Sequence, residues 1–342
     1  MDKNKTHTDQ SRRRVLTAAA LSFAASRLPL LHLASAQSET SETRTVNSGS
    51  SFPGFSATTV KTTGTTIHVL QKGVGRPVLL LHGYPETHLT WRKIAPDLAT
   101  QFAVVIPDLR GYGDSGKPEG GEMHENYSFR AMAQDQVDLM RHFGYDRFLV
   151  AAHDRGARVA HRLCLDHPAN VEKVCLMDIA PTLTMYRGTN QEFATRYMWW
   201  FFLIQAYPLP EHMIGLDPTF YLQGIFESLN KTPGAIGAGV MNDYIRAFSP
   251  ETIHATCEDF RAAAQIDLEM DEADDKAGTQ INCPVHALWG SKGTVGVMWD
   301  VLATWRAKCV APVTGGPLDC GHFLQEERPQ ELLEELRRFF RQ

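Results

Sequence analysis

The chain has 342 residues, of which 43% are hydrophobic and 21% are charged, and its formal net charge is −5. This composition is typical of a globular protein with a substantial core, and it excludes disorder over most of the length. Lys and Arg form no run outside the extreme N-terminus. The electrostatic footprint of a nucleic-acid-binding protein is therefore absent, and small-molecule chemistry is the favoured class of function.

The first 36 residues predict an export signal rather than part of the fold. The sequence SRRRVL at residues 11–16 is similar to the twin-arginine export motif, and an apolar stretch over residues 16–33 follows it. Several polar residues, Arg27 among them, make this stretch too polar for a transmembrane helix. Ala-Ser-Ala at 34–36 matches a signal-peptidase site, so we expect a periplasmic or secreted mature chain that begins near Gln37, without stable membrane association. A disordered basic tail on a cytosolic enzyme is the alternative.

Changing both Arg12 and Arg13 to lysine is expected to abolish export, because the adjacent arginines are the part of the signal that the translocation machinery reads. The measurement is the periplasmic yield of the mature chain, with N-terminal sequencing to locate its first residue. Equal yields from the double variant and the wild type would contradict the export assignment.

Six cysteines occur without a CxxC pair and without dense spacing. They therefore predict neither a zinc site nor a disulfide framework. The sequence leaves open whether any two of them form a disulfide after export. The six are Cys164, Cys175, Cys257, Cys283, Cys309 and Cys320.

A flexible linker is predicted over residues 37–51, which are rich in Ser, Thr, Glu and Asn. Beyond it, continuous apolar runs predict strands that are buried on both faces, as in a parallel sheet. Helical patterns over 130–143 and 155–165 alternate with these runs, which indicates an α/β fold with a mostly parallel central sheet. The predicted strands are 65–70, 78–81, 102–106, 148–152, 171–177, 285–289 and 313–318, and a closing helix carries Leu332, Leu333, Leu336, Phe339 and Phe340 on one face.

A helical lid is predicted over residues 182–280, inserted into a core made of residues 52–181 and 281–342. The first third of the insertion is crowded with aromatic and methionine side chains. Because the insertion follows a strand that ends at Asp178, these side chains are expected to line a site at the carboxyl edge of the sheet. Alternatively, these side chains form part of a hydrophobic core and line no site. They are Met185, Tyr186, Tyr197, Met198, Trp199, Trp200, Phe201, Phe202 and Tyr207.

Asp154 is the candidate nucleophile. It lies at the centre of AHDRGAR, residues 152–158, which joins a predicted buried strand to a predicted helix. The form small-x-nucleophile-x-small is that of the nucleophile elbow, in which small neighbours let the chain turn sharply and expose the central side chain. GxSxG occurs nowhere in the sequence, so a serine esterase would lack its nucleophile. An ordinary helix N-cap is the structural alternative.

His322 and Asp178 are the candidates for the general base and for the acid that orients it. His322 lies in DCGHF, residues 319–323, after the last predicted strand, and the order nucleophile, acid, histidine is the one that this type of site requires. Asp178 comes directly after a predicted strand, whereas the strand that ends at Trp289 is followed by Ser-Lys-Gly, which offers no carboxylate. We therefore choose Asp178 to orient His322 and to stabilise its charged form.

Two loops complete the predicted site. HGYP at residues 82–85 follows a strand, and the backbone N–H groups of Tyr84 and Arg155 are placed to bind a developing oxyanion. PDLRGYGDS at 107–115 follows the next strand and begins a GxGxxG match, but Lys-Pro-Glu-Gly-Gly comes after it instead of a helix, which excludes a dinucleotide site. HExxH and comparable ligand clusters are absent, so neither a metal nor a cofactor is expected.

Together these strings resemble the haloacetate dehalogenases, including fluoroacetate dehalogenases, which are relatives of the epoxide hydrolases and haloalkane dehalogenases. The resemblance runs from about Phe52 to the end and implies an α/β-hydrolase fold. Its most specific element is Asp154-Arg155 followed by Arg158, because the epoxide and haloalkane branches generally have an aromatic residue after the nucleophile. It implies that Arg155 and Arg158 hold the carboxylate of a haloacid, that halide displacement forms an ester of Asp154, and that His322 then activates the water that hydrolyses it.

The two arginines also predict an anionic substrate on physical grounds. A helix N-terminus favours anions, so two guanidinium groups in the first turn are unfavourable unless an anion lies nearby. A carboxylate nucleophile would repel an anionic substrate, and two guanidinium groups would offset this repulsion. Pairing of Arg158 with a structural carboxylate is the alternative.

The predicted halide pocket departs from the family, which uses a lid His-Trp pair and a later tyrosine. Aligning on PLPE at 208–211 places Trp199 and Trp200 at the pair, and aligning on CEDFR at 257–261 places Gln265 at the tyrosine. Only Trp200 keeps the family residue. The halide preference, the physiological substrate and cleavage of fluoroacetate are therefore left open.

Two other functions compete with dehalogenation. An epoxide hydrolase would use the same ester chemistry with lid tyrosines as acids, and Tyr186, Tyr197, Tyr207, Tyr221 and Tyr244 are available. The arginines disfavour its neutral substrate. A non-catalytic ligand-binding member of the fold is the other alternative, which the apparently complete catalytic set disfavours. The sequence also leaves a homodimer open.

Overall fold

The computed structural model describes residues 44–45 and 51–342. All the described residues belong to one compact unit of the chain. The predicted export signal lies outside the described residues, as does most of the predicted linker. Within that linker, however, Arg44–Thr45 forms a short strand that pairs with the sheet.

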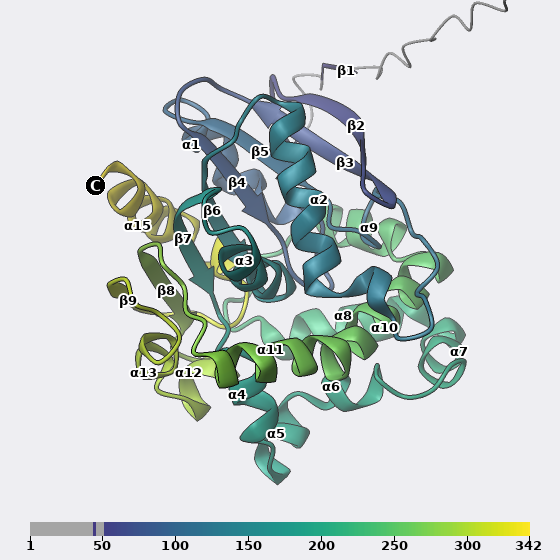
Figure 1. Cartoon of the computed structure of the whole chain (residues 1–342). Coiled ribbons are helices and arrows are strands. Elements are labelled where there is room, and N and C mark those ends of the chain that lie inside the picture. The colour runs from purple at the N-terminus through teal and green to yellow at the C-terminus, as the bar shows by residue number, and fades with distance from the viewer. Residues whose placement is uncertain (1–43, 46–50) are drawn as a thin grey trace, which may run out of the picture. The chain divides into compact units, whose positions relative to one another are not determined.

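A central sheet has the strand order β1-β2-β3-β5-β4-β6-β7-β8-β9 (Figure 1). The strands β1, β2 and β3 are antiparallel to their neighbours, and those from β5 to β9 in this order are parallel. The predicted α/β class is thereby confirmed. The bounds are β1 (Arg44–Thr45), β2 (Ser56–Thr62), β3 (Thr65–Lys72), β4 (Pro77–Leu81), β5 (Ala103–Pro107), β6 (Phe148–His153), β7 (Val171–Met177), β8 (Val285–Gly290) and β9 (Val313–Leu318).

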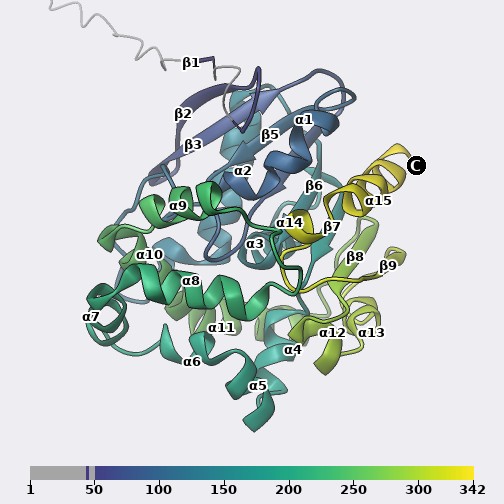
Figure 2. The same ribbon diagram turned by 180° about the vertical axis from the view of Figure 1, so that it is seen from behind.

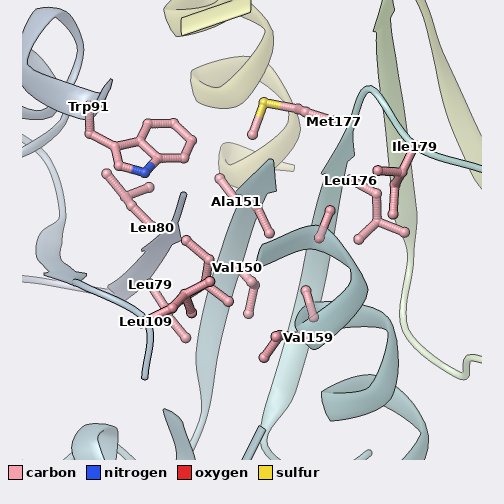
Figure 3. Packing of buried hydrophobic residues seen from close by; sticks show 14 of the residues in the cluster. Leu79, Leu80, Trp91, Leu109, Val150, Ala151, Val159, Leu176, Met177 and Ile179 are labelled. Carbon is pink, nitrogen blue, oxygen red and sulfur yellow. The ribbon is translucent and has the colours of Figure 1, made fainter. Parts of the chain in front are cut away.

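Helices cover both faces of the sheet, which is why its central strands are continuously apolar. The helices α2 and α3 lie on the face toward the viewer in Figure 1, and α1 and α15 lie on the opposite face, which Figure 2 shows. Figure 3 shows side chains of β4, β6 and β7 packed in the core between these layers, with Leu79, Val150 and Leu176 among them. The helices of the core are η1 (His88–Lys93), α1 (Ala95–Leu98), η2 (Glu125–Tyr127), α2 (Phe129–His142), α3 (Asp154–Asp166), α12 (Thr294–Met298), α13 (Val301–Arg306), α14 (Leu324–Glu327) and α15 (Pro329–Arg341).

The segment between β7 and β8 is entirely helical in its regular structure and lies beyond the carboxyl ends of β6 and β7 (Figures 1 and 2). Parallel strands end at this edge, so side chains that follow the strands meet the helices there. We keep the name lid for this segment, whose helices are α4 (Thr182–Arg187), α5 (Gln191–Arg196), α6 (Met198–Phe202), α7 (Leu209–Leu216), α8 (Pro218–Leu229), α9 (Ala238–Ala247), α10 (Pro250–Ala264) and α11 (Ile266–Ala277). In the part of the chain that the structure describes, none of the helices has the length and apolarity needed to cross a bilayer.

Candidate active site

Asp154 occupies a sharp turn between β6 and α3. Its φ of 45° lies in the left-handed region, which is uncommon for a residue with a Cβ and concentrates at functional sites. The turn requires small neighbours, because a Cβ on Gly156 would lie 2.4 Å from the carbonyl oxygen of His82. A Cβ on Gly83 would likewise lie 2.4 Å from the Cβ of Asp154. The geometry is that of a nucleophile elbow, with a carboxylate at its tip.

The Asp154 carboxylate is held between a backbone donor and a histidine. Its Oδ1 accepts a hydrogen bond from the Tyr84 N–H at 3.0 Å, and its Oδ2 lies 3.8 Å from His322 Nε2. Burial would raise the pKa of Asp154, but the charges of His322, His153 and Arg158 outweigh it and lower the pKa. Asp154 is therefore ionised at neutral pH, although only 6% of it is exposed.

Asp178 orients His322. It directly follows β7, where its own φ of 51° turns the side chain into the site. Its Oδ2 lies 2.5 Å from His322 Nδ1, and its Oδ1 accepts the backbone N–H of Gly290 at 2.9 Å. Because Nδ1–H donates to Asp178, Nε2 is the nitrogen that faces Asp154 and is free to accept a proton. Asp154, Asp178 and His322, which are far apart in the sequence, thus come together at one edge of the sheet.

The two predicted oxyanion donors lie next to Asp154 in space or in sequence. The Tyr84 N–H already contacts the nucleophile, and the Arg155 N–H belongs to the first turn of α3, where backbone donors have no helical partner. The Tyr84 N–H is thus a candidate oxyanion donor by its contact with Oδ1, and the same role for the Arg155 N–H stays a prediction.

The side chain of Arg155 forms a buried ion pair with Asp259. Its Nε donates to Asp259 Oδ2 at 2.9 Å, its Nη2 donates to the Asp259 carbonyl oxygen and to Oδ1, and its guanidinium lies over the rings of Phe129 and Phe260. Burial disfavours the charged form, but the Asp259 carboxylate outweighs it and raises the pKa of Arg155. A lid carboxylate from α10 thus already engages Nε and Nη2 of this guanidinium, and the substrate-binding role of Arg155 stays a prediction.

Arg158 lies on the next part of α3 and has no such partner. Its Nη1 donates to Thr182 Oγ1 at 3.0 Å and to the Ala180 carbonyl oxygen at 3.3 Å, and its Nη2 lies 3.2 Å from the Met185 sulfur. Its Nε is buried without a hydrogen-bond partner, and among the described residues the guanidinium forms no ion pair with a carboxylate. Burial lowers the pKa of Arg158 to about 10, although Asp154 acts in the opposite direction. A buried cation with an unused donor is expected where a ligand anion binds.

The predicted lid residues divide into buried and exposed ones. Trp200 is buried and lies over the Arg158 guanidinium, 4.6 Å from it. Trp199 is buried too and packs against Tyr197. Gln265 is exposed at the junction of α10 and α11, which corrects its assignment to the halide pocket. The alignment on residues 257–261 placed Gln265 in the halide pocket. In the structure, α10 ends at Ala264, and Gln265 is the exposed residue that caps its C-terminal end.

Sequence reasoning missed several residues that the fold brings to the site. Asp259 neutralises Arg155, and His153 and Glu86 form an ion pair beside His322. Tyr186, by contrast, was among the predicted lid residues, and its hydroxyl is buried without a hydrogen-bond partner while its ring packs on Trp200. Glu86 directly follows HGYP, and His153 directly precedes Asp154. Their positions next to these motifs could have identified them as residues near the site.

Two other groups of side chains have the composition of metal ligands. In the first, the Asp108 carboxylate already accepts the backbone N–H groups of His88 and Asp114 and contacts the His88 ring at 2.8 Å. In the second, Arg261 forms ion pairs with both glutamates. Because their acceptor atoms are occupied, we assign no metal to the groups His68, His88 and Asp108, and Glu211, His254 and Glu258.

Comparison with known proteins agrees with this geometry. Residues 76–329 match the family model of the alpha/beta hydrolase fold. A fluoroacetate dehalogenase from Burkholderia sp is 39% identical over 84% of this chain and 94% of its own, and a soluble epoxide hydrolase from Corynebacterium sp. (strain C12) is 31% identical over 81% and 94%. A crystal structure of an alpha/beta hydrolase candidate from Nostoc sp PCC 7120 is 55% identical, covers 84% of this chain and 98% of its own, and superposes with a TM-score of 0.82. The chain therefore belongs to the alpha/beta hydrolase fold family, is similar to fluoroacetate dehalogenase and epoxide hydrolases within it, and is a hydrolase.

Proposed function

We propose that this hydrolase cleaves the carbon–halogen bond of a short 2-haloacid, such as chloroacetate, through an ester of Asp154. Oδ2 of Asp154 attacks the carbon next to the substrate carboxylate, and halide leaves with the electrons of the broken bond. Oδ1 becomes the carbonyl oxygen of the ester and stays on the Tyr84 N–H, which it already contacts at 3.0 Å. The product of hydrolysis is the 2-hydroxy acid.

The second step uses His322. Its Nε2 takes a proton from a water molecule, whose oxygen attacks the ester carbonyl, and the Tyr84 and Arg155 N–H groups stabilise the oxyanion. The 3.8 Å between Nε2 and Oδ2 is longer than a hydrogen bond, so His322 is placed to act on water rather than to hold the nucleophile. Collapse of the intermediate releases the hydroxy acid, restores the Asp154 carboxylate and leaves the proton on His322 to pass to solvent.

The observation that carries the proposal is the unpaired guanidinium of Arg158. It is only 2% exposed, its Nε has no partner, and it adds a positive charge beside the nucleophile. A substrate carboxylate would satisfy this donor and neutralise the charge, whereas a neutral substrate would leave the charge uncompensated. Fluoroacetate, which appears in the name of the Burkholderia relative, is itself a 2-haloacid anion.

Epoxide hydrolysis is the second candidate, and one observation favours it. The buried Tyr186 hydroxyl has no partner and burial raises its pKa to about 12, so it would stay protonated and able to donate to an epoxide oxygen. The same hydroxyl could donate to a departing halide. Arg158 separates the two substrates, because a neutral epoxide leaves its buried charge uncompensated.

Halide release from chloroacetate and bromoacetate is expected to exceed that from fluoroacetate, and diol formation from styrene oxide is expected to be weaker than either of the first two. Fluoride is a poor leaving group that needs several aligned donors, each contributing ~2.7–4 kcal/mol by analogy with an oxyanion-hole donor. Here Trp199 replaces the expected histidine and Gln265 is exposed. The measurement is kcat/KM for all four substrates on the purified mature enzyme.

Two outcomes would contradict this ranking. A fluoroacetate value equal to or above that of chloroacetate would show that other lid donors complete a fluoride site. Diol formation faster than halide release would instead assign the enzyme to the epoxide hydrolases.

A further inference from the structure

Cys164 and Cys283 lie side by side in the structure although they are far apart in the sequence. Their sulfur atoms are 3.9 Å apart, and 119 positions separate the two residues. Cys164 belongs to the last turn of α3, the helix that begins with Asp154. Cys283 lies between α11 and β8, where the chain returns from the lid to the core. Among the described residues, no other pair of thiols makes such a contact, and all six cysteines are unbridged.

The main chain on both sides of this thiol pair is held in place. Arg162, two residues before the first thiol, is buried and forms ion pairs with Asp271 and Asp274, so that α3 and α11 are docked together (Figure 1). Ile281, two residues before the second thiol, exchanges backbone hydrogen bonds with the segment after α13, at 2.8 and 3.0 Å. Because both backbone segments are fixed, side-chain rotation is the movement that would shorten the sulfur–sulfur distance to the ~2.05 Å of a disulfide.

The two thiols differ in access and in acidity. Cys164 is buried, whereas Cys283 is half-buried. When the Cys164 S–H donates to Cys283, this hydrogen bond lowers the pKa of Cys283 and raises the pKa of Cys164. Thiol–disulfide exchange begins with an accessible thiolate, and a neighbouring thiol then completes it. Cys283 is therefore placed to react first, and Cys164 to react second.

We propose that Cys164 and Cys283 form a disulfide when the folded chain meets a disulfide oxidant, and that this bond ties the lid to the helix that carries the nucleophile. The Cys283 thiolate attacks one sulfur of the oxidant, whose S–S bond breaks, and the first half of the oxidant leaves and takes up a proton. Cys164 then loses its proton and attacks the Cys283 sulfur, and the second half of the oxidant leaves as a thiol. The two cysteines lose two electrons in all, and the oxidant gains them.

The loop that this disulfide closes explains what the bond would do. The loop contains β7 and every helix of the lid, from α4 to α11. A cross-link over a long loop restricts the unfolded chain, so it stabilises the folded state. Oxidants of this class act outside the cytoplasm, where the predicted export signal would bring the chain. The inference goes beyond haloacid hydrolysis and does not depend on it.

Oxidised glutathione at pH 8 is the probe, applied to the purified mature chain. Alkylation of the denatured protein is expected to label six thiols before the treatment, four after it and six again after reduction with dithiothreitol. Peptide mapping without reduction is expected to show the peptide of Cys164 linked to that of Cys283. The Tm of the oxidised chain should exceed that of the reduced chain by about 5–10 °C, because the bond closes a long loop.

Three serine variants identify the partners. Cys164→Ser and Cys283→Ser should each keep five free thiols after the treatment, and the treatment should not change their Tm. Cys309→Ser is the matched control, because Cys309 is bridged to Ile281 beside the same pair, and Cys283 adds to the effect of burial in raising its pKa. This variant should still form the bond, which would leave three free thiols.

Several results would overturn the proposal. Among them are six free thiols after the treatment and a glutathione adduct that persists on Cys283 while Cys164 stays free. A bond that survives in Cys164→Ser and is lost in Cys309→Ser would assign the pair to Cys283 and Cys309 instead. A mapped bond without a rise in Tm would refute its stabilising role.

The test does not rely on a single variant or on catalysis. Should Cys164→Ser not fold, Cys283→Ser and the peptide map of the wild type decide the same question, since Cys283 is half-buried and tolerates replacement better. None of the measurements uses a haloacetate. A failure of the proposed function would therefore leave this result unchanged, and a failure to form the disulfide would leave the ester mechanism standing.

Discussion

Replacing His322 with asparagine is expected to stop the enzyme at the ester of Asp154. His322 is the base for the second step only, so the first displacement proceeds once and halide appears in an amount equal to the enzyme. Loss of a positioned general base lowers the rate of a step by about 10²–10⁴-fold. With chloroacetate, the intact mass of the variant should rise by about 58 Da, the mass of one carboxymethyl ester group.

Asp154→Ala is the companion variant, because it removes the nucleophile and should give neither turnover nor a mass increase. The His322 loop stays in place in this variant, since its bonds to Asp178 and His153 do not involve Asp154. An unmodified His322→Asn protein that still releases halide through many turnovers would exclude the covalent mechanism. So would an adduct that persists in Asp154→Ala.

Arg158→Met is expected to lower kcat/KM for chloroacetate by roughly 10- to 150-fold with little loss of stability. A charge-assisted contact to the substrate carboxylate contributes about 1.5–3 kcal/mol, and methionine cannot supply it. In the free enzyme, the guanidinium is a buried cation with an unused Nε–H. Removing such a group should leave the free energy of unfolding within about 1 kcal/mol of the wild-type value or raise it, although contact with Trp200 is partly lost.

Arg155→Met is the matched comparison on the same helix, and the opposite pattern is expected. It leaves the Asp259 carboxylate buried with only the Tyr112 hydroxyl as a side-chain donor, at 2.6 Å. Breaking a buried ion pair from one side costs about 3–5 kcal/mol, so the Tm should fall steeply. Thermal unfolding and haloacetate kinetics on both variants test the division of roles. An unstable Arg158→Met protein with unchanged KM, or a stable Arg155→Met protein with impaired binding, would reverse the assignment of the two arginines.

Local sequence patterns were sufficient to predict the architecture and to name a candidate catalytic set whose members lie close together in the structure. Continuous apolar runs are confined to strands covered on both faces, so β4, β6 and β7 could be placed to within a residue or two. Asp154 could be singled out because a sharp strand–helix turn tolerates only small neighbours, and the structure shows what Gly156 and Gly83 would otherwise contact. Asp178 and His322 followed from strand ends, since parallel strands deliver the residues that follow them to one edge.

Side-chain pairing across the lid was decided by the tertiary structure alone. Arg155 and Arg158 look equivalent in the sequence, three residues apart on one helix, yet Asp259 reaches only the first of them, from a helix about a hundred residues later. The same applies to His153, whose ring contacts Glu86 and the carbonyl oxygen of His322. Gln265 was assigned to the pocket by counting residues from an aligned motif. Such a count does not show whether the residue that follows the end of a helix faces the pocket or the solvent. A local motif specifies the turn that exposes a side chain. The residue that pairs with that side chain comes from a distant part of the sequence, and the packing of the lid on the core decides which residue it is.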